Sequence, residues 1–469
     1  MFELFFAGLL AARRTGLAGL GPVEAPSLGT AKIAQLALAC LVLVAAFVAE
    51  LRVIDVAAAT QVPMPPWFAR LPLVPIDENP PLNGHTPPWV GNDLLALATL
   101  QCGALYALYR SLRGRTLGIV GTVLVACACA ALLGCALATH ATAAGADLYL
   151  NVGYGHLGID AYATPARPFP GEFVAINRLL GVPILSAAYG PLWIFVASAI
   201  VNAFGTLATQ LQALRVAGAL AFVACAFCLR AAGVTPAGVA LFALNPALVF
   251  QYVVDAHNDI FPLAFALLAL AVARRAPWLA LICVVCAGAM KLPFAVAGAL
   301  AFAQLPERGR RIAFAAAALA LSLAATELGS GGRYFVSVTY ALGYQRLDDP
   351  FDRLGHALAI AAAAGTFALA LWARRFIASG SWTFLAFGAI VLPWYAAWGI
   401  PYAVLQRTFL PVYLILLPLL AFDLSTTFGL TPAARLLFIV VMLSPLVYLI
   451  QQRRSAHGAV PSDRKAVLS

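Results

Sequence analysis

The amino-acid sequence predicts an all-α polytopic membrane protein. Hydrophobic residues make up 63% of the 469 residues and charged residues 10%, against about 45–50% and 25% in soluble domains. Many apolar runs approach the roughly 20 residues that an α-helix needs to span the hydrocarbon layer. These runs are continuous rather than alternating, which excludes the strands of a membrane barrel. No polar stretch is long enough to bury a core of its own, so we expect no separate soluble catalytic domain.

Residues 1–115 form an N-terminal extension with two of the expected helices. Arg13 and Arg14 follow a short apolar stretch and place the N-terminus on the cytoplasmic side, because basic residues near spans mark that side. The first span is expected at about 32–50 and the second at about 93–109. A Pro-rich outer loop joins them.

A larger module is expected over 116–405. It begins with a span at about 116–139, which a long outer loop at about 140–190 follows. The apolar segment 191–206 leaves two topologies open, since it either crosses the membrane or is a re-entrant or surface helix. We prefer the second topology, because it puts Arg230 inside and the polar clusters on one face of the membrane.

The remaining spans are assigned by the same charge rule. The expected spans of the module are about 216–229, 235–254, 260–272, 277–290, 293–304, 312–327, 355–373 and 382–393. C-terminal transmembrane helices at about 408–422 and 433–450 occupy 406–450, and a polar tail covers 451–469. The total is about 12–13 transmembrane helices with long outer loops. The basic residues of the tail conflict with this parity, so one C-terminal element is misassigned.

The most concentrated polar interruption is Asp255-Ala256-His257-Asn258-Asp259, which separates two apolar runs. Ionisable groups cost about 2.5–3.5 kcal/mol each at a bilayer centre on insertion scales, so they persist mainly where a cavity or a partner uses them. Capping of the next helix by Asn258 or Asp259 is an alternative explanation for one of these side chains. His257, Asn258 and Asp259 are candidates for binding sugar hydroxyls, phosphate oxygens or a metal.

Lys291 is the most unusual basic residue of the chain. Of the 29 lysines and arginines only three are lysines, and Lys291 lies inside an apolar run. Its ammonium group either reaches the membrane interface along its own stem or pairs with a phosphate. Arg333, in an outer loop expected at about 329–353, is a second candidate for phosphate binding.

Asp147 is the candidate general base. In sugar transfer from a phosphate-linked donor the phosphate leaves without an acid, whereas the acceptor hydroxyl needs a base, so one carboxylate is enough. Asp147 follows the third expected span closely, and the alternative is a solvated aspartate in a loop. Other candidates for substrate binding on the same side are Tyr149, Asp160, Tyr162, Tyr189, Trp394 and Tyr395. The two aromatic residues last named either stack on a sugar or belong to an interfacial aromatic belt.

The order of these motifs resembles the GT-C superfamily of membrane glycosyltransferases. The motifs are Asp147-Leu-Tyr149 after a span, Gly158-Ile-Asp160-Ala-Tyr162, Tyr189-Gly-Pro-Leu, Asn245-Pro with His257-Asn-Asp259, Lys291 among small residues, and Pro393-Trp-Tyr-Ala-Ala-Trp398. The resemblance covers about 116–405. Within the superfamily the chain looks most like the bacterial polyprenyl-phosphate-mannose-dependent mannosyltransferases.

The resemblance implies an inverting transfer of a sugar, mannose in the enzymes it looks most like, from a polyprenyl-phosphate donor to a glycan or glycolipid acceptor. It implies an integral protein of the bacterial inner membrane with its site facing the periplasm. It also implies that Asp147 is the base and that Tyr189, Lys291 and the segment 257–259 line the donor pocket. The first motif lacks a second adjacent acid, which leaves a divalent metal open and keeps Asp160 as a rival base.

No other cofactor is implied, and we expect no nucleic-acid partner. The net charge of +10 is what a multispanning protein with cytoplasmic arginines shows. Two other functions stay open, namely a transporter or flippase of a lipid-linked or anionic solute, and a glycan ligase or polymerase that uses a diphosphate-linked lipid. The position of the polar clusters at span ends favours the enzyme over a transporter, which places ionisable groups on broken helices near the midplane. Composition does not separate the transferase from the ligase.

Overall fold

The computed structural model describes residues 28–61, 88–139, 146–164, 186–344, 364–365, 367–373, 396–406 and 409–420. Within these ranges every element is a helix, which confirms the all-α class. Four described helices are long and apolar enough to cross a membrane, or five if one bent pair counts as a single span. The chain is therefore an all-α polytopic membrane protein. The expected total of 12–13 spans includes segments outside the described residues.

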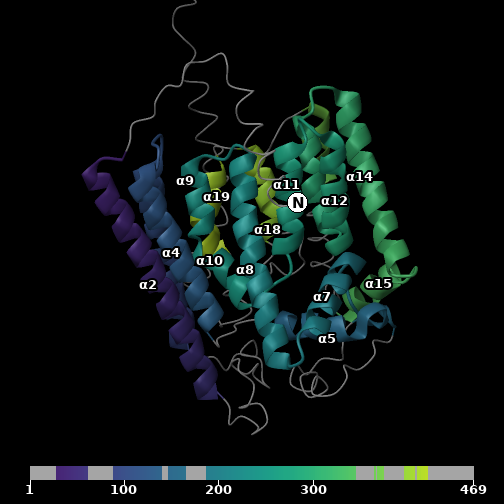
Figure 1. The fold of residues 1–469 in the computed structure, drawn as a ribbon, viewed down its shortest axis with the longest axis horizontal. Coiled ribbons are helices and arrows are strands. Elements are labelled where there is room, and N and C mark those ends of the chain that lie inside the picture. Colours follow the sequence, from purple (N-terminus) through teal and green to yellow (C-terminus); the bar gives the residue numbers. More distant parts are fainter. Residues whose placement is uncertain are drawn as a thin grey trace, which may run out of the picture.

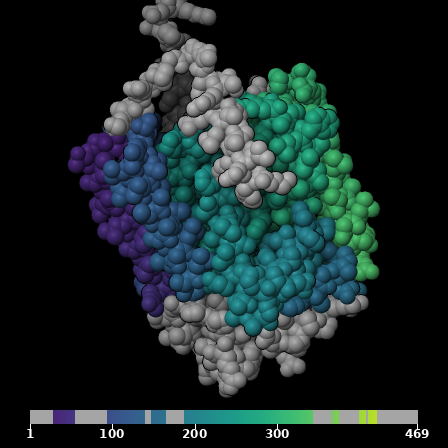
Figure 2. Space-filling model, in the orientation of Figure 1, coloured from purple at the N-terminus to yellow at the C-terminus, as the bar shows by residue number. Residues whose placement is uncertain are grey.

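The N-terminal helices are α2 (Thr30–Gln61), α3 (Pro88–Leu112) and α4 (Gly118–Ala138); α2 and α3 contain the first two expected segments, and α4 lies within the third. α2 packs against both α3 and α4. Figure 1 shows α2 and α4 along one edge of the bundle and α14 (Arg308–Gly329) along the opposite edge. Leu41, Ile119 and Leu328 on these edge helices are 65%, 84% and 79% exposed, as expected for side chains that face lipid. Figure 2 shows the two sets of helices on opposite sides of the surface.

Two expected outer loops contain helices, which corrects the sequence prediction. α5 (Ala146–Leu157) and η3 (Gly158–Tyr162) lie within 140–190, and α15 (Tyr334–Tyr344) lies within 329–353. They form because their apolar residues pack on neighbours, as the burial of Leu148 and Val152 on one face of α5 shows. α7 (Pro191–Ala203) has 13 residues, a length of about 20 Å, so its length resembles that of α11 and α12 and the choice between the two topologies stays a prediction. α5, α7 and α15 gather at one end of the bundle (Figure 1).

Prolines begin several of the remaining helices. Pro stands at the first helical position of α7, α9, α10, α12 and α13, where its missing N–H costs no hydrogen bond. The remaining helices are α8 (Leu207–Ala231), α9 (Pro236–Ala243), α10 (Pro246–Val249), η4 (Phe250–Val254), α11 (Ile260–Val272), α12 (Pro277–Met290), α13 (Pro293–Ala299), η5 (Leu300–Gln304), α18 (Ala396–Leu405) and α19 (Leu410–Leu420).

The span expected at 235–254 is broken. α9 and the α10–η4 segment meet at an angle of 50°, because Pro246 cannot continue a helix and restricts Asn245 before it. η4 is a π-helix, a rare form that is frequent at functional sites. The break changes the direction of the chain just before the polar segment 255–259.

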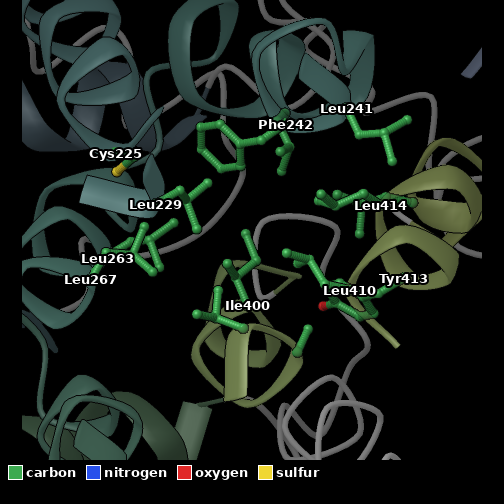
Figure 3. Close-up of a cluster of buried hydrophobic side chains, with 14 of the residues drawn as sticks. Cys225, Leu229, Leu241, Phe242, Leu263, Leu267, Ile400, Leu410, Tyr413 and Leu414 are labelled. Carbon is green, nitrogen blue, oxygen red and sulfur yellow. The ribbon is translucent and has the colours of Figure 1, made fainter. Parts of the chain in front are cut away.

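The buried apolar side chains form two clusters. The bundle core joins α2, α3, α4, α8, α9, α11, α12, α13, α18 and α19. Figure 3 shows its centre, where Phe242, Leu263, Ile400 and Leu414 from four different helices point toward one another. The end core joins α5, η3 and α7 with Met290 and other residues. The polar segment 255–259 lies where the two cores meet, since Ala256 belongs to the end core and Val254 to the bundle core.

Gly190 is expected to tolerate no side chain. A Cβ atom at this position would lie 2.1 Å from the carbonyl oxygen of Ala289, and backbone atoms cannot move aside cheaply. We expect Gly190→Ala to lower the free energy of unfolding by about 1–3 kcal/mol, as overpacking usually does. The thermal unfolding of purified protein in detergent measures this loss. Gly103→Ala is the matched control, because open space surrounds Gly103, and equal stability losses in the two variants would contradict the prediction.

Candidate active site

The segment 255–259 is buried and conformationally strained. All five of its residues are buried between η4 and α11, and the His257 N–H donates to the carbonyl oxygen of Gln251 over 3.0 Å. Ala256 has a φ of 48°, a left-handed conformation that costs a residue with a side chain roughly 1–2 kcal/mol. Strain of this kind persists only where the surroundings impose it, and it clusters at functional sites.

Asp147 is joined to this segment by a hydrogen bond. The Nδ1 atom of His257 lies 3.1 Å from the Oδ2 atom of Asp147, and the Tyr189 hydroxyl donates to the same oxygen over 3.2 Å. The Asp147 side chain is 20% exposed, whereas that of His257 is 1% exposed. His257 and Tyr189 therefore orient a carboxylate that a substrate can still reach.

Lys291 and Asp259 form a buried ion pair at the other end of the segment. The Lys291 Nζ atom donates to Asp259 Oδ2 over 2.7 Å, and the Trp398 indole N–H donates to Asp259 Oδ1 over 2.6 Å. Asp259 occupies the N-cap position of α11 but makes no capping hydrogen bond. The Asp259 carboxylate accepts hydrogen bonds from Lys291 and Trp398 and does not cap the helix, so the capping alternative does not hold for this residue.

Tyr189 connects the two ends of the site. Its hydroxyl contacts Asp147, while its ring lies below Lys291 Nζ, 5.4 Å from the ring centroid. The Trp398 ring lies 5.7 Å from the same ammonium group, and both distances are typical of cation–π contacts. The charges of Lys291 and Asp147 also interact. The predicted acid and the predicted cation therefore lie in one cluster, which comprises Asp147, Tyr189, His257, Asp259, Lys291 and Trp398 and which we call the acid–lysine cluster.

An extended segment, Ser186–Gly190, holds Tyr189 in place. The Tyr162 hydroxyl donates to the carbonyl oxygen of Tyr189 over 2.8 Å, and the Ser337 hydroxyl donates to that of Ala187 over 2.7 Å. The Gly190 N–H donates to the carbonyl oxygen of Met290, directly before Lys291, over 2.8 Å. Tyr162 was a candidate for substrate binding, and the structure gives its hydroxyl a backbone partner that positions Tyr189.

The other predicted site residues are distributed around this cluster. Asn258 is buried in the same segment, and its carbonyl oxygen accepts the Phe261 N–H. Tyr149 is buried on α5 and interacts with Arg215 rather than with Asp147. In the described part of the chain, Asp160 of η3 is half-buried and Arg333, before α15, is exposed. Trp394 and Tyr395 lie outside the described residues.

Trp398 and Asp255 were not among the candidate residues. Trp398 closes the Pro-Trp-Tyr-x-x-Trp motif, and that spacing was the signal that pointed to it. Asp255 lies two residues before His257 in the sequence. Only the fold shows that its carboxylate interacts with Arg215, whereas His257 contacts Asp147. In the described ranges no three His, Cys, Asp or Glu side chains come close enough to hold a metal ion.

The environment of Asp147 favours its ionised form. Burial raises the pKa of this carboxyl, but the hydrogen bond and charge of His257, the charge of Lys291 and the hydrogen bond from Tyr189 outweigh it. The pKa of Asp147 therefore lies below its ordinary value of 3.8. A base with this pKa is present above that value and is lost as the pH falls through the lowered pKa.

His257→Gln is expected to move the acid limb of the pH–activity profile to higher pH. The substitution removes the ring and its charge, which are the first causes of the low pKa of Asp147, so the carboxyl protonates at higher pH. The profile of kcat/KM for the purified protein measures the shift. His156→Gln is the matched control, because His156 contacts Gln210 instead. An acid limb that stays in place in His257→Gln would contradict the assigned pairing.

The described helices and the acid–lysine cluster can be compared with known protein families. Residues 155–305, which are 151 of the 469 residues, match the family model described as alpha-(1->6)-mannopyranosyltransferase, N-terminal domain. This match confirms the resemblance drawn from the motifs and supports a mannosyltransferase activity. The matched range includes Tyr189, His257, Asp259 and Lys291 and begins eight residues after Asp147. No curated protein and no solved structure matches the chain.

Proposed function

We propose that this protein is an inverting mannosyltransferase that moves mannose from a polyprenyl-phosphate donor to a hydroxyl group of a glycan or glycolipid. The observation that carries this proposal is the contact of Tyr189 with both Asp147 and Lys291. A base for the acceptor thereby contacts the hydroxyl of Tyr189, and a cation for the donor phosphate lies over the ring of the same residue. The proposed catalytic part is the module 116–405.

Asp147 acts on the acceptor in this proposal. Its carboxylate takes the proton of the acceptor hydroxyl while the hydroxyl oxygen forms the new bond to the anomeric carbon of the sugar. His257 and Tyr189 each hold the Oδ2 atom, so the Oδ1 atom is the one directed at the proton. The partial exposure of Asp147 supports this role, since a general base must come within hydrogen-bond reach of the group that it deprotonates.

Lys291 acts on the departing phosphate. The bond between the anomeric carbon and the phosphate oxygen breaks as the new bond forms, and the electron pair stays on the polyprenyl phosphate. Because the two events occur on opposite faces of the anomeric carbon, the configuration inverts. Asp259 holds the Lys291 ammonium group, whose positive charge would face the departing phosphate. Stabilisation of charge that develops in the transition state is usually a large contribution to catalysis.

The donor and the site are proposed to meet at the outer face of the membrane. The helices α5, α7 and α15 gather at one end of the bundle (Figure 1), and α5 carries Asp147. The charge rule applied to the sequence puts this end outside, where lipid-linked sugars are the activated donors at hand. The polyprenyl chain of such a donor would lie against the apolar outer faces of the spans.

A transfer assay in proteoliposomes tests the proposal. The purified protein is supplied with polyprenyl-phosphate mannose and a mannosyl glycolipid, and the product is analysed by mass spectrometry and by NMR of the anomeric centre. We expect a product with one additional mannose of inverted configuration. A second reaction with a diphosphate-linked glycan tests the ligase alternative, and a product only in that reaction would overturn the assignment.

The broken span favours a transporter as the second candidate function. Transporters place ionisable groups at discontinuous helices, and α9 meets α10–η4 at 50° just before the segment 255–259. The same proteoliposomes separate the two functions. Movement of the lipid-linked sugar across the bilayer with no covalent product would identify a transporter.

A further inference from the structure

A second set of buried polar side chains includes Asp255, the first residue of the segment 255–259. The members of this set have no part in the proposed reaction. Asp255 and Arg215 of α8 are each 0% exposed, and their opposite charges interact. Tyr149, on α5, interacts with the same guanidinium group. Asp147 and Tyr149 are two residues apart, so α5 directs one side chain to the acid–lysine cluster and the other to Arg215.

Helices outside the matched family range complete this second set. The Arg215 Nη1 atom donates to the carbonyl oxygen of Thr139, at the end of α4, over 2.6 Å. Glu50 of α2 accepts a hydrogen bond of 2.7 Å from Gln101 of α3, and the charge of Glu50 interacts with that of Asp255. Arg215 and Asp255 thus carry opposite charges inside an apolar bundle, and the charge of Glu50 repels that of Asp255. Burial of an ion pair is weak evidence for stability alone, because desolvation can exceed the attraction between the charges.

The backbone beside Asp255 indicates what the pair does. Ala256 directly follows Asp255 and has a φ of 48°, so some external contact must hold it in that conformation. α8 supplies two such contacts from one face, since positions three apart on a helix are neighbours. The buried Arg215 guanidinium group attracts the Asp255 carboxylate, and Gly218 admits the carbonyl oxygen of Tyr252, on η4, so closely that a Cβ would lie 2.3 Å from it.

We propose that Arg215 and Asp255 are positioning residues that hold the strained turn at Ala256 and thereby direct His257 toward Asp147. Neither side chain touches the substrate in this scheme. The kinetic consequence rests on the proposed function, whereas the consequence for the contact between His257 and Asp147 rests on geometry alone. The two consequences are therefore measured separately.

The test compares Asp255→Asn with Asp255→Asn/Ala256→Gly. The asparagine weakens the pairing with Arg215, so the turn relaxes and His257 moves away from Asp147. Glycine adopts a positive φ without steric cost, so the second substitution lets the turn persist without the attraction between Asp255 and Arg215. The readouts are kcat and KM for transfer, and the ¹⁵N NMR signal of the His257 ring, assigned with His257→Gln.

We expect Asp255→Asn to lower kcat by about tenfold to a hundredfold, the scale for a misplacement of about 1 Å, with a much smaller change in KM. The His257 signal should move toward its position in Asp147→Asn. Adding Ala256→Gly should restore most of the lost kcat and return the signal. An unchanged signal in Asp255→Asn, or a double variant no better than the single one, would overturn the proposal. If the wild type transfers no mannose, the NMR signals still decide the positioning role.

Arg215→Lys provides the test if Asp255→Asn does not fold. Lysine keeps the charge but lacks the planar set of donors, so we expect a smaller loss of kcat and a His257 shift in the same direction. Arg311→Lys is the matched control, because Arg311 is buried and donates to backbone carbonyl groups of Leu371 and Pro306 instead. Equal losses of kcat in the two variants at equal thermal stability would overturn the positioning role.

Discussion

Asp147→Asn is expected to lower the rate of mannose transfer by about a hundredfold to ten-thousandfold, the range for loss of a general base. The amide has nearly the same shape, so the fold and the binding of the polyprenyl-phosphate donor should persist. The rate is measured with saturating donor and acceptor, and donor binding is measured separately with a labelled donor. Full transfer by the purified variant would contradict the role of Asp147.

Asp160→Asn is the matched control for this prediction. Both aspartates belong to the same stretch of chain, and the Asp147 side chain contacts His257 and the Tyr189 hydroxyl in the acid–lysine cluster. We therefore expect a far smaller loss of rate in Asp160→Asn than in Asp147→Asn. The reverse order would identify Asp160 as the base and would require a different position for the acceptor.

Lys291→Met is expected to lower kcat by about a hundredfold to a thousandfold, similar to the loss of one donor that stabilises transition-state charge. It should also lower stability, because Asp259 would be left buried without its cation, a change that typically costs about 3–5 kcal/mol. The Trp398 N–H stays on Asp259 and offsets a small part of this loss. Transfer kinetics and thermal unfolding of the same preparation measure the two effects.

The double variant Lys291→Met/Asp259→Asn separates the two effects. It removes both charges together, so the free energy of unfolding should recover toward that of the wild type. The rate of transfer should stay low, because no cation faces the phosphate. Recovery of transfer together with stability would show that Lys291 serves only the fold.

Much of the helical bundle was predictable because the hydrocarbon layer imposes continuous apolar runs on any span. The expected limits of the third span, 116–139, agree closely with α4 (Gly118–Ala138). The expected starts of the segments 191–206 and 277–290 coincide with Pro191 and Pro277, where α7 and α12 begin. α5 and α15 were missed because each is short and packs on the end of the bundle, and such packing is absent from local sequence patterns.

The acid–lysine cluster was predictable where the chemistry is unusual for the chain. Lys291 was noticed because lysine is rare here and because its neighbours are apolar, and His257 because it interrupts an apolar run. Which side chains pair with one another inside the cluster was not predictable from the sequence. Asp259 was expected to bind substrate or cap a helix, yet it holds Lys291 and Trp398, which come from elements far apart in the sequence. Arg215 gave no signal, because nothing local to it indicates that it meets Asp255.

The shared tyrosine has a consequence for how this site can be altered. Tyr189 contacts the base Asp147 through its hydroxyl and the cation Lys291 through its ring. A substitution near Asp147 should therefore also change the function of Lys291, and the reverse. Mutational effects at contacting residues do not add, so changes that retune donor choice and changes that retune acceptor choice should show strong epistasis. An effort to redesign either preference would therefore have to vary the surroundings of Asp147 and of Lys291 in the same library.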